Sequence, residues 1–265
     1  MFYNAKEGKL NIKNASFDYI RFGTGKKPLL MIQGLNTNGI KGASLSLAYM
    51  YRIFAKEYTV YLFDRRDEVY DGITVKDFAL DIAEAVDELG IKNADVFGVS
   101  QGGMIAQYLA IERPDLVHKM VLAVTLSKNN ETVQNVVSNW IAITKQGDFK
   151  ALVFDMAEKM YSDEYVKRYK FVMPLLTLLQ KPKDVERFLI LAKSCLTCYT
   201  YDELEKITCP VFVIGGKRDK VVTGEASEEI AEKLGCECYL YEKLGHAAYE
   251  EGKDFNKRVF EFLKK

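Results

Sequence analysis

Apolar residues along this chain gather in two kinds of segment: short continuous runs, and longer stretches with helical spacing. A continuous run such as residues 28–32 is typical of a strand that is buried on both faces of a sheet. Polar and turn-forming residues separate the runs from one another. By this pattern, the predicted strands are residues 10–12, 16–22, 28–32, 59–64, 94–97, 117–125, 210–214 and 237–241.

Most of the stretches between these runs carry apolar residues three and four positions apart, as one face of a helix requires. One such helix is expected to begin at Thr74 and to end at Gly90, because glycine commonly follows the last helical turn. Strands that alternate with helices predict crossover connections and a mostly parallel central sheet flanked by helices, the α/β class. The helices predicted in this alternation are residues 44–56, 74–89, 104–113, 225–234 and a last helix ending near residue 263.

The alternation lapses between residues 129 and 201, where successive helices are predicted to start near residues 132, 148, 162 and 183. No Pro- or Ser-rich linker borders this segment, so we interpret it as a helical lid inserted into one core domain. The expected boundaries are residues 1–128 and 202–265 for the core and 129–201 for the lid. The lid is rich in large apolar residues, and we expect Trp140, the only tryptophan, to form a wall of the substrate pocket.

The composition narrows the possible partners. With 265 residues, of which 48% are hydrophobic, the chain is long enough for one large α/β core. Lys plus Arg and Asp plus Glu balance at 37 each, which argues against nucleic acid or an anionic membrane as a partner. The first residues lack an apolar signal core, and the longest apolar run, residues 171–179, is too short to cross a bilayer. We therefore expect a soluble, cytoplasmic protein.

The five cysteines do not indicate a cofactor. An odd count in a chain without a signal segment favours reduced thiols. Cys195 and Cys198 form a C-x-x-C pair, but Cys195 falls on the apolar face of a predicted helix, and no second pair completes a metal site. We therefore expect neither a metal nor an organic cofactor.

The clearest chemical motif is Gly98-Val99-Ser100-Gln101-Gly102, which lies between a predicted strand and a predicted helix. A serine on such a sharp turn is a nucleophile elbow, in which a strained backbone holds the hydroxyl clear of the sheet. The flanking glycines fit because strand and helix approach too closely there for a Cβ atom. The sequence therefore predicts Ser100 as a nucleophile.

A serine hydroxyl is a weak nucleophile at neutral pH and needs a base within hydrogen-bond reach. Of the two histidines, His118 leads into a strand among charged neighbours and is expected on the surface. His246 follows the last strand, at the sheet edge where α/β proteins place their sites, and is the predicted base. Asp219 follows the strand at residues 210–214 and is the predicted acid that fixes the tautomer of His246.

The order serine, acid, histidine and the elbow motif resemble the α/β-hydrolase superfamily, of the lidded esterase- or lipase-like kind. The segment Arg113-Pro114-Asp115-Leu116-Val117 also resembles what commonly follows the elbow helix in that family. The resemblance covers nearly the whole chain. It implies the α/β-hydrolase fold and the roles just given to Ser100, Asp219 and His246.

The resemblance also implies an oxyanion hole made by the backbone N–H groups of Gln101 and Leu35. The chain departs from the family here, because Gln33-Gly34 stands where relatives commonly have His-Gly. A second departure is residues 64–69, Asp-Arg-Arg-Asp-Glu-Val, in place of a glycine-rich segment. We expect the main-chain donor at Leu35 to serve despite the first departure, and the second leaves the subfamily open.

These features predict a serine hydrolase that cleaves an ester-like bond of a small, moderately apolar substrate through an acyl-enzyme. The same residues would also serve a lactonase, a thioesterase, a carbon–carbon bond hydrolase or an aminopeptidase. A small-molecule receptor that turns over slowly on the same fold is a further alternative.

Overall fold

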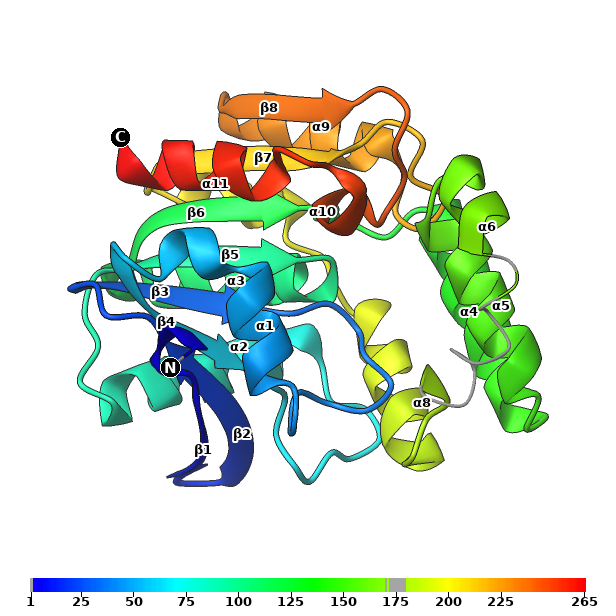
Figure 1. Ribbon diagram of the computed structural model, residues 1–265, viewed down its shortest axis with the longest axis horizontal. Helices are drawn as coiled ribbons and strands as arrows, with labels where there is room; N and C mark the ends of the chain where they lie inside the picture. The colour runs from blue at the N-terminus through cyan, green and yellow to red at the C-terminus, as the bar shows by residue number, and fades with distance from the viewer. Residues whose placement is uncertain (1, 170, 172–179) are drawn as a thin grey trace.

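The computed structural model describes residues 2–169, 171 and 180–265. Its centre is an eight-stranded sheet with the strand order β1-β2-β4-β3-β5-β6-β7-β8 (Figure 1). The first two strands form an antiparallel hairpin, and β2 is also antiparallel to β4. The strands are β1 Lys6–Ile12, β2 Ala15–Phe22, β3 Lys27–Ile32, β4 Tyr58–Phe63, β5 Ala94–Val99, β6 Val117–Ala123, β7 Val211–Gly216 and β8 Glu237–Tyr241.

From β4 to β8, every neighbouring pair of strands is parallel. Their carboxyl ends therefore meet at one edge of the sheet, on the side where α4, α5, α6 and α8 lie in Figure 1. All residues of β5 and β7 are buried, as expected for parallel strands covered on both faces. The predicted α/β class with a mostly parallel sheet is confirmed.

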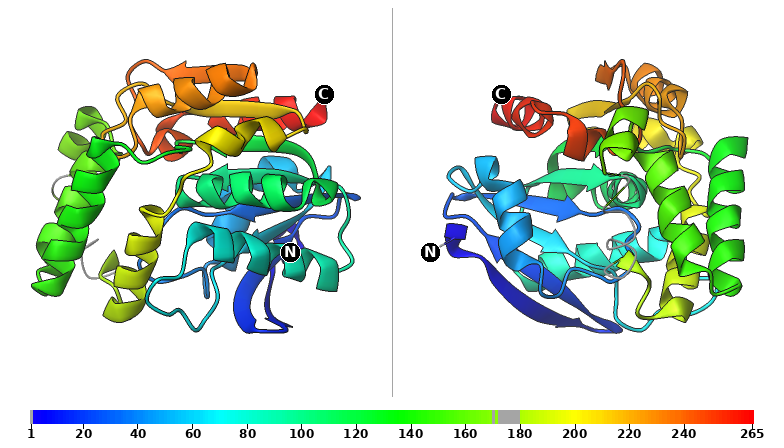
Figure 2. Two further views of the ribbon diagram at one scale, coloured as in Figure 1. Left: turned by 180° about the vertical axis from the view of Figure 1, so that it is seen from behind. Right: turned by 45° about the vertical axis from the view of Figure 1, so that its right-hand side comes forward.

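Helices cover both faces of the sheet (Figure 2). Buried side chains of α1 and α11 pack on one face, and those of α2, α3 and α9 pack on the other. The helices are α1 Ser44–Met50, α2 Val75–Glu88, α3 Gln101–Glu112, α4 Glu131–Lys145, α5 Phe149–Met160, α6 Asp163–Tyr169, α8 Val185–Cys195, α9 Gly224–Leu234, α10 Ala248–Glu251 and α11 Phe255–Lys264.

Local sequence signals set both ends of α2. Thr74 accepts a hydrogen bond from the Asp77 N–H in a capping box at the start of α2, and Gly90 follows its end with φ at 63°. One predicted helix, residues 44–56, is shorter than expected. It ends at Met50, and a 3₁₀ turn follows over Arg52–Phe54. The apolar spacing continues past the break because Phe54 is buried in the same core, so periodicity alone could not locate the end.

Between β6 and β7, the described residues add no strand to the sheet. They form α4, α5, α6 and α8, which begin close to the four predicted positions. An isolated bridge between Lys128 and Tyr199 joins the two ends of this segment. Most of the apolar run at residues 171–179 lies outside the described residues. Of the helices that the structure describes, none is both long enough and apolar enough to cross a membrane.

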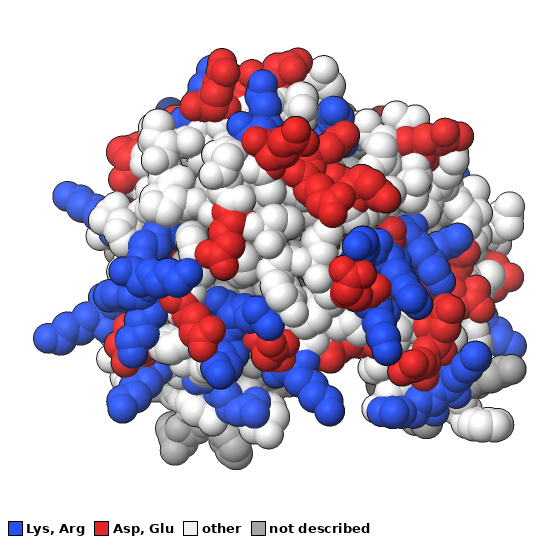
Figure 3. Space-filling model, turned by 90° about the horizontal axis from the view of Figure 1, so that it is seen from above, with Lys and Arg blue, Asp and Glu red and all other residues white. Residues whose placement is uncertain are grey.

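Charged side chains of both signs are interspersed on the face shown in Figure 3. This distribution agrees with the equal counts of basic and acidic residues in the sequence.

Candidate active site

Ser100 occupies the sharp turn between β5 and α3, with φ at 53° and ψ at −119°. This conformation is rare for a residue with a side chain and stores strain that the surroundings must hold. The Ser100 N–H donates to the Ala123 carbonyl at 2.8 Å, and the Thr125 hydroxyl donates to the Ser100 carbonyl at 2.7 Å. A Cβ atom on Gly98 would lie 2.5 Å from the Gly102 carbonyl oxygen, so the close approach of strand and helix requires glycine.

Ser100, His246 and Asp219 form one chain of hydrogen bonds. The Ser100 Oγ lies 2.9 Å from His246 Nε2, and His246 Nδ1 lies 2.8 Å from Asp219 Oδ2. A carboxylate only accepts hydrogen bonds, so the proton of the neutral imidazole resides on Nδ1 and Nε2 accepts from the serine. His246 and Asp219 are buried, with 3% and 7% of their surfaces exposed, whereas Ser100 is partly exposed. The structure therefore brings together the three side chains that the sequence singled out.

Backbone contacts hold the acid and the base in place. The N–H groups of Val221 and Val222 donate to the other oxygen of Asp219, at 2.7 and 3.0 Å. The Ala247 N–H donates to the Met160 carbonyl at 2.7 Å, which joins the loop of His246 to the end of α5. The second histidine, His118, is half-exposed and pairs with Asp95 at 2.8 Å near the start of β5 and β6, so its predicted surface position is confirmed.

The loop after β3 also packs closely against Ser100. A Cβ atom on Gly34 would lie 3.2 Å from the Ser100 Cβ and 3.7 Å from its Oγ. Within the part of the chain that the structure describes, the N–H groups of Leu35 and Gln101 donate to no protein acceptor. Two main-chain donors beside the serine are therefore free to bind a ligand oxygen.

Arg65 is a residue of this site that sequence reasoning missed. Its guanidinium is buried and donates to Gln101 Oε1 from Nε at 2.9 Å and from Nη2 at 2.7 Å. Nη2 also donates to the Gly34 carbonyl. The Gln101 amide nitrogen in turn donates to the Leu191 carbonyl of α8 at 2.8 Å and to Ser194 Oγ at 3.0 Å. The only signal in the sequence was that residues 64–69 depart from the glycine-rich segment of the family.

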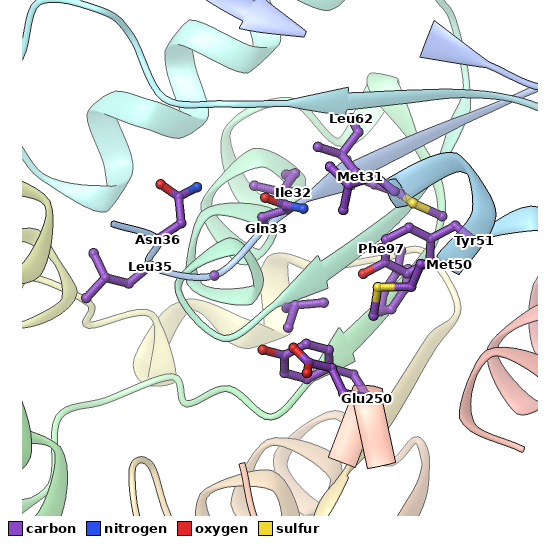
Figure 4. Close-up of a pocket in the computed structure, with 14 residues that line it drawn as sticks. Met31, Ile32, Gln33, Leu35, Asn36, Met50, Tyr51, Leu62, Phe97 and Glu250 are labelled. Atoms are coloured by element: carbon purple, nitrogen blue, oxygen red, sulfur yellow. The ribbon is translucent and has the colours of Figure 1, made fainter. Parts of the chain in front are cut away.

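Two cavities lie along the loop after β3 and share Leu35, Asn36 and Glu250. Ser100 is not among the lining residues of either, but the first is lined by its neighbour Val99 and by Gly34. The first has about 200 Å³ of free volume and lies between the loop after β3, α1 and α10. In Figure 4, its apolar end is formed by Met31, Met50, Tyr51 and Phe97, and Glu250 lies across from the loop that carries Leu35. The second has about 250 Å³ of free volume and is lined in addition by the α5 residues Val153, Met156, Ala157 and Met160.

Trp140, the predicted pocket wall, is not among the lining residues of either cavity. It is buried on α4, and its indole N–H donates to Asp155 of α5 at 2.8 Å. A buried indole usually finds such an acceptor, and here the hydrogen bond joins two helices, so the side chain does not line the site.

Burial raises the pKa of the Cys195 and Cys198 thiols to about 12, so both remain protonated at neutral pH.

Comparison with known proteins identifies the family. The sequence pattern described as alpha/beta hydrolase fold matches residues 27–253 of the chain. The chain belongs to the alpha/beta hydrolase family. A relative of this alpha/beta hydrolase, the 3-oxoadipate enol-lactonase 2 of Acinetobacter baylyi, is 21% identical over 233 residues, which cover 85% of this chain and 84% of that protein.

Solved structures agree with this assignment. MGS-M2, an alpha/beta hydrolase enzyme from a Medee basin deep-sea metagenome library, superposes with a TM-score of 0.86 and 20% identity, covering 97% of this chain and 98% of that one. The enol-lactonase from Burkholderia xenovorans LB400 superposes with a TM-score of 0.84 and 19% identity, covering 97% and 100%. At these identities the superpositions establish the fold, and the relatives together support a hydrolase.

Proposed function

We propose that this alpha/beta hydrolase is a serine hydrolase that cleaves an ester bond in a small, neutral, moderately apolar substrate. The observation that carries the proposal is the continuous chain of hydrogen bonds from Ser100 through His246 to Asp219, at 2.9 and 2.8 Å. It lies at the carboxyl edge of a parallel sheet, where such folds bind their ligands, and the loop after β3 next to it lines two cavities.

In the first half of the reaction, Ser100 Oγ attacks the carbonyl carbon of the ester while His246 Nε2 accepts the hydroxyl proton. Asp219 receives the Nδ1–H bond throughout and stabilises the imidazolium by its negative charge. The carbonyl oxygen becomes an oxyanion, which the free N–H groups of Leu35 and Gln101 bind. His246 then returns the proton to the leaving alcohol, and an acyl-enzyme ester on Ser100 remains.

In the second half, water takes the place of the alcohol. His246 accepts a proton from this water as it attacks the acyl-enzyme, and the same two N–H groups bind the second oxyanion. The proton then passes from His246 to Ser100 Oγ as the acyl bond breaks. The acid product leaves, and the serine is regenerated.

We infer the class of substrate from the residues that line the two cavities. The first offers an apolar end for an acyl or alkyl group, formed by side chains such as Met31 and Phe97. Among the described residues that line the two cavities, Glu250 is the only one with an acidic or basic side chain, and burial raises its pKa above the usual range of a carboxyl group. At a pH above this pKa, a carboxylate group on the substrate would meet a like charge. We therefore infer a preference for neutral substrates.

We propose that residues 129–201 act as the lid of this site. Four residues of α5 line the second cavity, between the lid and the loop after β3. Two acidic residues of α10 accept hydrogen bonds from the residues that directly follow α5. The Tyr161 hydroxyl donates to Glu250 at 2.6 Å, and the Ser162 hydroxyl donates to Glu251 at 2.6 Å.

A lactone is the second candidate substrate, because the A. baylyi relative and the B. xenovorans structure are named as enol-lactonases. A lactone is a cyclic ester, and the same steps would open it. The alcohol released from Ser100 would then stay attached to the acyl group as one open-chain product. The substrate itself would be a single compact ring bound next to Ser100.

Labelling with a fluorophosphonate probe, followed by a substrate panel, tests the proposal. We expect rapid labelling at Ser100 and turnover of p-nitrophenyl esters of increasing chain length, with lactones, thioesters, a carbon–carbon substrate and aminoacyl amides run beside them. A half-ester bearing a free carboxylate should react about tenfold more slowly than its neutral counterpart, a difference of about 1.4 kcal/mol, and Glu250→Gln should narrow this gap. Saturable ligand binding without labelling or turnover would overturn the hydrolase and favour a receptor.

A further inference from the structure

A buried arginine lies behind both of the proposed oxyanion donors. Arg65 follows β4, and only 2% of its surface is exposed. Its Nη2 donates to the carbonyl of Gly34, in the loop after β3, and to the side chain of Gln101, at the start of α3. One guanidinium therefore bridges the two segments that carry the free N–H groups of Leu35 and Gln101.

The bond to Gly34 fixes the direction of the Leu35 N–H. The Gly34 carbonyl and the Leu35 N–H belong to the same peptide unit, which is planar and trans. In a trans peptide the C=O and the N–H point in opposite directions. By holding the carbonyl, Arg65 keeps the Leu35 N–H directed away from the guanidinium, where it has no acceptor among the described residues.

The bonds to Gln101 fix the residue next to the nucleophile. Two N–H groups of Arg65 converge on Gln101 Oε1. On the other side of the amide, Gln101 Nε2 donates to the Leu191 carbonyl and to Ser194 Oγ, both on α8. The side chain is therefore held from two directions, and its backbone at the first position of α3 is held with it.

The charge of this buried arginine is only partly compensated. Burial opposes its charge and lowers its pKa, and Nη1 has no hydrogen-bond acceptor among the described residues. The nearest carboxylate oxygen to Nη1, on Asp64, is 3.9 Å away. Replacing a buried charged network with apolar residues of similar volume is often neutral or stabilising. A role in orienting Gly34 and Gln101 would explain why an arginine occupies this buried position.

We propose that Arg65 is a positioning residue that orients the Leu35 and Gln101 N–H groups toward the oxyanion and so supplies the support that the family's His-Gly pair commonly gives. The inference rests on the proposed function. It predicts that Arg65 contributes to the transition state and little to substrate binding.

The test compares Arg65→Met with Arg66→Met. Arg66 is the matched control because it is the next residue and its guanidinium makes two hydrogen bonds, at 2.9 and 2.7 Å, to Asp81, which no step of the mechanism uses. We expect Arg65→Met to lower kcat by about 10- to 100-fold, less than the roughly 100- to 1,000-fold for complete loss of one donor. KM should change little, and Arg65→Lys should restore part of kcat. Arg66→Met should keep kcat within about threefold.

A readout of oxyanion binding separates orientation from folding. A trifluoromethyl ketone forms a tetrahedral adduct on the serine whose oxygen occupies the oxyanion hole, so its Ki should rise in Arg65→Met by the same factor as kcat/KM falls. The double variant Arg65→Met/Gln101→Met should keep the melting temperature of the native protein while kcat stays low.

Unchanged kcat in Arg65→Met would overturn the inference, as would a loss of kcat without a matching rise in Ki. Either result leaves the proposed function standing as long as Ser100→Ala abolishes turnover. Turnover retained in Ser100→Ala would overturn the proposed function itself.

Discussion

The two halves of the candidate site are built in different ways. The acid–base half joins Ser100, His246 and Asp219, and each side chain lies on a loop at the carboxyl end of a parallel strand. The proposed oxyanion half consists of main-chain N–H groups, and the contacts around them come from Arg65 after β4 and from α8 in the helical segment. The first half depends on side-chain chemistry, and the second depends on how distant segments pack.

This difference has a consequence for substitutions. A change in the acid–base half removes a reacting group, so its effect on the rate should be large whatever the surroundings do. A change in the oxyanion half shifts a donor by fractions of an ångström, so its effect should be smaller and graded. The sizes of the losses in kcat therefore test whether the two halves contribute to catalysis in these two different ways.

The largest effect is expected for Ser100→Ala. Loss of the nucleophile should lower kcat on a short p-nitrophenyl ester by about a million-fold, the usual scale for such a residue. Steady-state kinetics at equal protein concentration would measure it, and the circular dichroism spectrum should remain that of the native protein. If the variant retained one per cent of the native rate, Ser100 could not be the nucleophile.

Asp219→Asn should cost about 10⁴-fold in kcat, because an amide no longer fixes the proton of His246 on Nδ1. The substitution keeps the size of the side chain and one oxygen for the Val221 and Val222 N–H groups, so folding should be retained. The control is Asp95→Asn, which changes the partner of the other histidine, His118, and should leave kcat nearly unchanged. Equal losses in both variants would show a general effect of burying an amide.

The sequence predicted the acid–base half because its signals are local. A strand, a turn and a chemically distinctive residue occur within a few positions, as at Gly98–Gly102, and the rule for parallel sheets brings strand ends together. The sheet and most helix starts were predictable for the same reason. The end of α1 was not, because the buried Phe54 continues the apolar spacing through a 3₁₀ turn.

The support of the oxyanion half could not be predicted in this way. Arg65 contacts Gln101, 36 positions away, and Gln101 contacts Leu191, 90 positions away. Such pairings follow from packing of the helical segment against the core, and no local pattern encodes them. Trp140 shows the same limit: its size and rarity suggested a pocket wall, whereas the structure uses its indole to join α4 to α5.

Gly34→Ala should have an intermediate effect. The added Cβ would lie 3.2 Å from the Ser100 Cβ, so the loop or the serine must move by a few tenths of an ångström. A displacement of about 1 Å can cost 100-fold, so we expect a loss of about tenfold in kcat/KM. The rate of fluorophosphonate labelling should fall in parallel, because that adduct also places an oxygen in the oxyanion hole. Unchanged labelling would indicate that the loop yields freely.

The smallest effect is expected for Gln33→His, which installs the residue that relatives commonly carry. If the family's histidine were needed to orient the Leu35 N–H, this change would raise kcat. Because Arg65 already holds the Gly34 carbonyl, we expect kcat to change by less than about threefold, within the range of substitutions that alter no key contact. In an Arg65→Met background the same change should restore part of the lost rate, because the new side chain then has an orientation to supply. A large rise in kcat for Gln33→His in the otherwise native protein would show that the residue at position 33 orients the Leu35 N–H more strongly than Arg65 does. Kinetics of the two single variants and the double variant would measure the coupling between the two positions directly.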